Sequence, residues 1–146
     1  MSSDLAHYAH TMDLNDPHTP LYLRLGGREK IRALLDKFYA AAGEDPVLGP
    51  VFNTAVEDWS HHMDKVTDFW VTQCGGPVVY QGGMGRHVRL GLEHAHFLAW
   101  LALWEKTCRA ELPEREATEL VDRAKFFAGR IKEMSSGGVR LLPPGA

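Results

Sequence analysis

The stretch YQGGMGRHVRLGLEHAHFLAWLALW, residues 80–104, decides how the rest of the sequence is interpreted. It begins in a glycine-rich segment that contains His87, and glycine lets the backbone leave a regular helix there. The apolar residues that follow recur at helical spacing and predict one aromatic stripe of Phe97, Trp100, Leu101 and Trp104. A histidine in a loop before an aromatic wall is what a flat apolar cofactor with one open metal valence requires. The alternative is a surface histidine before an ordinary buried helix.

The composition of the 146 residues is that of one globular domain, with 45% hydrophobic and 24% charged residues. The formal net charge is -3 and no run of lysine and arginine occurs, which argues against nucleic acid as a partner. The longest apolar run, residues 97–104, is too short to span a bilayer, and the first ten residues lack the pattern of a signal peptide. We therefore expect a soluble, cytoplasmic protein with no membrane partner.

Hydrophobic periodicity predicts an all-α fold. Four substantial helices are expected, together with a short helix or turn at 21–25 and a proline- and glycine-rich turn at 45–52. The four helices are 29–42, one that starts after Asp58 and ends before Gly75, one through Trp104 to about 111, and 114–134. The domain organisation follows: a flexible N-terminal arm at 1–20, a folded domain at 21–134 and a C-terminal tail at 135–146. Cys74 and Cys108 form no CxxC pair and are predicted to be small buried hydrophobes.

Three polar side chains fall on apolar faces of different predicted helices: Tyr39, His62 and Trp100. Polar groups that converge in an apolar interior are typical of a binding pocket. Each also has an ordinary explanation, since Tyr39 can sit at the edge of a core with its hydroxyl in water and His62 can be a satisfied core histidine. His61 is expected to point to solvent.

Three segments in this order resemble the truncated haemoglobins: FYAAAGEDPVLGPVF (38–52), DWSHHMDKVTDFW (58–70) and HVRLGLEHAHFLAWLALW (87–104). The resemblance covers roughly residues 21–134. The second segment and the WLALW run are most similar to the third subgroup, whereas Gly26-Gly27 and GGPVVY are more similar to the other two. The resemblance implies a shortened globin, a two-over-two helical sandwich around haem b.

The same resemblance implies roles for individual residues. His87 matches the iron ligand, because in the family that histidine precedes a leucine by three residues, here Leu90, and the helix tryptophan by thirteen, here Trp100. A choice of His94 would leave six residues to that tryptophan. Tyr39, His62 and Trp100 match the distal residues that stabilise the bound ligand. The expected cofactor contacts are Phe52, Met63, Phe69, Trp70, Tyr80, His87, Leu90, Phe97 and Trp100.

The implied function is reversible binding of dioxygen, carbon monoxide and nitric oxide at a five-coordinate iron. Several distal donors imply slow oxygen release, which suits nitric oxide dioxygenase or peroxidase-like detoxification better than transport. Such turnover needs an external electron donor or reductase, because no flavin or nicotinamide motif is present. The expected assembly is a monomer or weak homodimer. Two alternatives are a non-haem helical sensor or interaction module, and a metal-binding protein that uses His87, His94 and His96.

Overall fold

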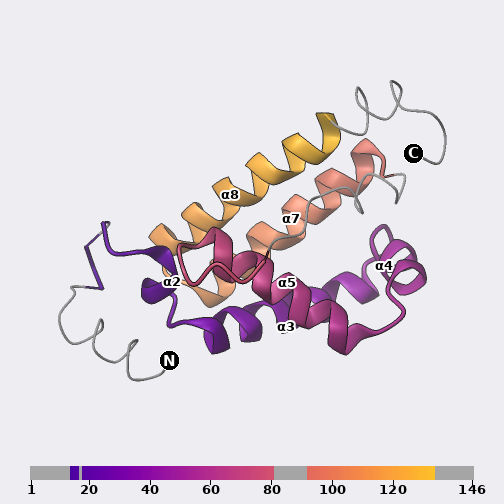
Figure 1. Ribbon diagram of the computed structural model, residues 1–146. Helices are drawn as coiled ribbons and strands as arrows, with labels where there is room; N and C mark the ends of the chain where they lie inside the picture. The colour runs from indigo at the N-terminus through magenta and orange to yellow at the C-terminus, as the bar shows by residue number, and fades with distance from the viewer. Residues whose placement is uncertain (1–13, 17, 81–91, 134–146) are drawn as a thin grey trace. The chain divides into compact units, whose positions relative to one another are not determined.

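The computed structural model describes residues 14–16, 18–80 and 92–133, and in this part of the chain all regular structure is helical (Figure 1). The all-α prediction is confirmed. Within these ranges, no helix is long and apolar enough to cross a membrane. The helices are α2 (Leu21–Arg24), α3 (Arg28–Glu44), α4 (Gly49–Ala55), α5 (Trp59–Gln73), α7 (His94–Glu111) and α8 (Glu114–Glu133).

The chain forms two compact units. The first unit comprises residues 1–37 and 58–81, and the second comprises residues 38–57 and 82–146. Helix α3 contributes its first ten residues to the first unit and continues into the second. Its apolar face is the predicted one, because Ile31, Leu34, Leu35 and Phe38 are all buried.

In the first unit, α2 is attached to the end of α5. The backbone N–H of Tyr22 donates to the carbonyl oxygen of Cys74 at 2.8 Å. Helix α2 stops at a pair of glycines, as predicted, and Gly26 has a φ of 99°, a conformation that glycine adopts without strain. Cys74 is buried, as is Cys108 of the second unit, and neither thiol is in a disulfide. Both cysteines therefore have the buried environment that the sequence predicted.

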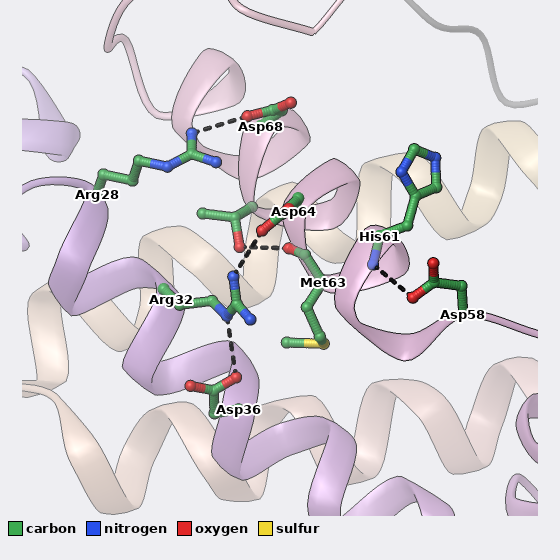
Figure 2. Close-up of polar contacts among 9 residues, drawn as sticks. Arg28, Arg32, Asp36, Asp58, His61, Met63, Asp64 and Asp68 are labelled. Carbon is green, nitrogen blue, oxygen red and sulfur yellow. Dashed lines mark hydrogen bonds and ion pairs between the residues drawn. The ribbon is translucent and has the colours of Figure 1, made fainter. Parts of the chain in front are cut away.

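Ion pairs join α3 and α5 within the first unit, as Figure 2 shows. Arg28 pairs with Asp68 at 2.8 Å and Arg32 pairs with Asp64 at 3.0 Å. The arginines and the aspartates are each four residues apart, so each pair of like residues lies on one face of its helix. The higher-numbered arginine meets the lower-numbered aspartate, hence the two helices run antiparallel. Arg32 also reaches Asp36 at 3.1 Å, and the hydrogen bond to that carboxylate is the main cause of the raised pKa of the guanidinium.

In the second unit, α7 and α8 form an antiparallel pair joined by a short connection at Leu112 and Pro113 (Figure 1). At one end Arg109 donates to the hydroxyl of Thr118 at 3.3 Å, and at the other end the Nδ1 atom of His94 lies 2.7 Å from the Nζ atom of Lys132. The buried stripe of α8 supplies the apolar side of this pair, as its spacing predicted. Its buried apolar members are Ala117, Leu120, Val121, Ala124, Ala128 and Ile131.

Residues 49–55 form helix α4, where the sequence indicated only a turn. Pro50 is the second residue of this helix, a position at which the missing N–H removes no intrahelical bond. The turn prediction gave proline and glycine too much weight as helix breakers. Leu48 is buried, whereas Val51 and Phe52 are half-buried.

Candidate functional site

Tyr39 lies in an aromatic group of the second unit. Its ring contacts Phe52 of α4 at a centroid distance of 5.5 Å, with the planes nearly perpendicular. Its neighbour Phe38 lies edge-on at 4.9 Å. Burial raises the pKa of the Tyr39 phenol well above its ordinary value. The hydroxyl therefore remains protonated, and able to donate a hydrogen bond, at any physiological pH.

Trp100 stacks on Trp104 one turn further along α7. The ring centroids are 5.9 Å apart and the interplanar angle is 6°. Phe38 approaches both indoles edge-on, at 5.8 Å from Trp100 and 5.2 Å from Trp104. Trp104 is almost fully buried, whereas Trp100 is half-buried. Through Phe38, the predicted distal residues Tyr39 and Trp100 belong to one connected group of rings.

Phe97, predicted to contact a cofactor, is buried in an apolar cluster with Ala128 and Ile131 of α8. Leu92 and Leu101 pack against the same cluster. These contacts explain the burial of Phe97 by helix packing alone. Its assignment as a cofactor contact therefore stays a prediction from the family resemblance.

In the first unit, the start of α5 positions His62. The side chain of Asp58 accepts from the backbone N–H of His61 at 3.1 Å and caps the helix, whereas the sequence alone left the cap open between Asp58 and Asn53. Figure 2 shows this cap. His61 is exposed, as expected, while His62 is half-buried and its ring meets Trp59 edge-on at 5.4 Å. The Nε2 atom of His62 is shielded from solvent.

The other first-unit candidates lie further along α5. Met63 and Trp70 are buried, and Phe69 lies edge-on to Tyr80 at 5.3 Å. Tyr80 is held against α5 by Thr72, whose hydroxyl accepts from the backbone N–H groups of Val79 and Tyr80 at 3.1 and 3.0 Å. Thr72 was not predicted, because a threonine in the last turn of a helix carries no signal of a contact with a later segment.

His87 and Leu90 lie outside the described residues, so the predicted iron ligand has no described geometry. The other two histidines of this stretch are described, and the Nδ1 atom of each has a partner in the helical framework. His96 Nδ1 accepts from the backbone N–H of Glu93 at 2.8 Å, and His94 Nδ1 lies 2.7 Å from Lys132. Among the described residues, no group of three or more histidine, cysteine, aspartate or glutamate side chains is placed to hold a metal ion.

The described candidates therefore form two aromatic groups. Tyr39, Phe52 and Trp100 belong to a connected group in the second unit. In the first unit, Phe69 lies between Trp70 and Tyr80, while His62 contacts Trp59. Each group contains one polar group beside aromatic rings: the Tyr39 hydroxyl in the second unit and the His62 imidazole in the first.

Comparison with known proteins agrees with this helical architecture. The group 3 truncated hemoglobin ctb of Campylobacter jejuni is 29% identical over 113 residues, which are 73% of this chain and 89% of that protein. The crystal structure of a group III truncated hemoglobin from Campylobacter jejuni has a TM-score of 0.69 at 29% identity, covering 74% of this chain and 90% of the other. That of the group II truncated hemoglobin from Bacillus anthracis has a TM-score of 0.68 at 24% identity, covering 80% and 92%, and shows the fold alone.

The predicted resemblance to truncated haemoglobins, closest to the third subgroup, is thus confirmed. The family model described as bacterial-like globin matches residues 20–133, most of the chain. Membership in a globin family implies that the protein binds haem. The chain belongs to the bacterial-like globin family.

Proposed function

We propose that this protein binds haem b through His87 and reversibly binds dioxygen, carbon monoxide and nitric oxide at a five-coordinate haem iron. The observation that carries this proposal is the half-buried Tyr39 phenol within a ring group that also contains Phe52 and Trp100. A protonated phenol among aromatic rings, in a chain of the globin family, is suited to donate to a polar ligand beside an apolar cofactor.

The described residues fit haem by their chemistry. The second unit offers two neutral donors, the Tyr39 hydroxyl and the indole N–H of Trp100, and the first unit offers the imidazole of His62. The remaining candidates are apolar or aromatic, which suits the face and edge of a porphyrin. None of these donors adds a carboxylate or ammonium charge that would have to be desolvated beside the macrocycle.

Bound haem would supply an iron that takes up diatomic ligands. The residues of the chain would determine how long a ligand stays. In our proposal the Tyr39 hydroxyl and the Trp100 N–H would donate hydrogen bonds to a bound diatomic ligand, and such bonds are stronger when the acceptor carries negative charge. The family resemblance suggests His62 as a further donor. Aromatic rings lie beside each of these donors, and hydrogen bonds are stronger where water is excluded.

Strong retention of dioxygen favours redox chemistry over oxygen transport. We propose detoxification of nitric oxide or peroxide, with electrons from an external reductase. The proposed assembly in solution is a monomer or weak homodimer of a globin domain at residues 21–134. The coordinate bond from His87 and the electron donor are proposed from the family resemblance.

The visible spectrum of the purified protein tests the proposal. We expect a strong Soret band that shifts when dithionite reduces the protein and shifts again when carbon monoxide is added. His87→Ala should abolish the Soret band, and added imidazole should restore it. His94→Ala, a histidine in the same stretch of sequence, is the matched control and should keep the spectrum. A colourless protein that takes up no added haemin would contradict the proposed function.

A further inference from the structure

The stacked indoles of α7 have surroundings that suit the loss of an electron. Indole is one of the most easily oxidised side chains, and a second ring stacked on it spreads positive charge over both. Trp100 and Trp104 are near parallel, with an interplanar angle of 6° and a centroid separation of 5.9 Å.

The two indoles differ in their exposure and in their polar contacts. Trp100 is half-buried, so an oxidant can reach it more readily than Trp104, which is 1% exposed. The indole N–H of Trp104 donates to the backbone carbonyl oxygen of Leu120 on α8 at 3.1 Å. That hydrogen bond strengthens when positive charge develops on the indole, because the donor becomes charged.

We propose that Trp100 and Trp104 form an electron relay, in which an oxidant takes one electron from Trp100 and Trp104 replaces it. The oxidised ring is then the buried Trp104. This inference rests on the proposed function for its physiological oxidant, which is of the peroxide class acting through bound haem. The ring pair itself is independent of that function.

Each transfer moves one electron and no atom. Trp100 loses an electron to the oxidant and becomes a radical cation, and Trp104 then donates an electron that restores Trp100. The Trp104 radical cation keeps its N–H proton, because the carbonyl of Leu120 is a hydrogen-bond acceptor but a very weak base. A reductant of the thiol or ascorbate class returns the electron. Two such electrons, with two protons from solvent, reduce one hydrogen peroxide to two waters.

Burial of a positive charge is unfavourable, so the relay requires compensation at Trp104. Two groups on the same unit provide it. The stacked Trp100 ring shares the charge, and the Leu120 carbonyl points its negative end at the N–H. Exclusion of water from Trp104 also removes the base and nucleophile that would consume the radical.

The test has two arms, both with the full-length purified protein and electron paramagnetic resonance as the readout. In the first arm a light flash with a sacrificial acceptor generates a ruthenium(III) polypyridyl complex, a one-electron oxidant that needs no haem. In the second arm hydrogen peroxide is added to the coloured protein. Ring-deuterated tryptophan narrows the signal and identifies the radical as an indole.

We expect a tryptophan radical in both arms, with a lifetime about tenfold shorter in Trp104→Phe, as loss of a charge-assisted hydrogen bond and a stacked ring predicts. Trp100→Phe should lower the yield, because the remaining indole is buried away from the oxidant. Trp59→Phe removes a tryptophan that is also half-buried and is the matched control, with the signal unchanged. Trp100→Phe replaces a half-buried ring, so it still tests the relay if Trp104→Phe does not fold.

The relay is wrong if Trp104→Phe and Trp100→Phe both leave yield and lifetime at the parent level, or if Trp59→Phe lowers the signal as much as they do. Failure of the proposed function gives a different result. The protein would then be colourless and peroxide would produce no radical in any variant, while the flash arm would still report on the pair.

Discussion

The ring of Tyr22 lies so close to the backbone of Gly76 that a Cβ atom built at this glycine would be 2.6 Å from ring atom Cδ1. Two more ring atoms, Cγ and Cε1, would lie at 2.8 and 2.9 Å. The Tyr22 ring cannot easily move away from Gly76, because the backbone N–H of Tyr22 is hydrogen-bonded to the carbonyl oxygen of Cys74. Gly76 does not have a positive φ, so the close approach, and not the backbone conformation, requires glycine here.

Gly76→Ala should therefore lower the free energy of unfolding by about 1–3 kcal/mol, as expected for overpacking against a rigid ring. Gly129→Ala is the matched control, since a Cβ there would meet nothing within 4 Å and the residue lies inside α8. That control should raise the free energy of unfolding by about 0.5–1 kcal/mol. Urea denaturation measures both. Equal stability of Gly76→Ala and the parent would show that the ring moves aside.

Thr72→Val should release the segment that carries Tyr80. The substitution keeps the shape of the side chain but removes the oxygen that accepts from two backbone N–H groups. We expect the free energy of unfolding to fall by about 1–2 kcal/mol, because water can reach part of this contact. Faster hydrogen exchange at Val79 and Tyr80 would locate the effect, and Thr72→Ser, which keeps the hydroxyl, should behave as the parent. If hydrogen exchange at Val79 and Tyr80 were unchanged in Thr72→Val, the Thr72 hydroxyl would not be what holds this segment.

Stability at alkaline pH should depend on Tyr39. An unfolded tyrosine ionises near pH 10, whereas burial raises the pKa of Tyr39 in the folded protein. Above that pH the unfolded state has lost a proton that the folded state keeps, so the free energy of unfolding falls as pH rises. Tyr39→Phe should flatten this decline above about pH 10. The measurement is urea denaturation at several pH values.

Release of dioxygen should become faster when a distal donor is removed. We expect Tyr39→Phe and Trp100→Leu each to raise the dissociation rate about tenfold, the effect of losing one hydrogen bond to a charged group. His62→Ala should also raise it, and His61→Ala is its matched control because His61 is exposed. Stopped-flow mixing of the oxygenated protein with dithionite gives the rates. Rates that match the parent would contradict the role of these donors.

Much of the fold could be predicted because it depends on local patterns. The 3.6-residue period located α3, α5, α7 and α8, Asp58 was one of two candidate caps for α5, and the glycines after α2 marked its end. Helix α4 was missed for a physical reason. Proline is compatible with a first helical turn, so a segment with Pro50 near its start can be helical although it resembles a turn.

The candidate site was predictable only in part. The position of His62 on an apolar stripe could be recognised, and its half-buried ring agrees with that. The role of Thr72 and the bond from Trp104 to Leu120 could not be recognised, because each depends on segments that meet only after folding. The roles assigned to His87 and Leu90 stay predictions.

The two ion pairs between α3 and α5 also have a consequence for how the helices align. Sliding α5 by one turn in either direction would leave a single arginine opposite an aspartate, since Arg28 and Arg32 match Asp68 and Asp64 only in the observed alignment. Partly exposed ion pairs contribute little to stability. Their larger effect is on selectivity among alignments, because apolar stripes can slide by a turn with little loss of burial but these charges cannot.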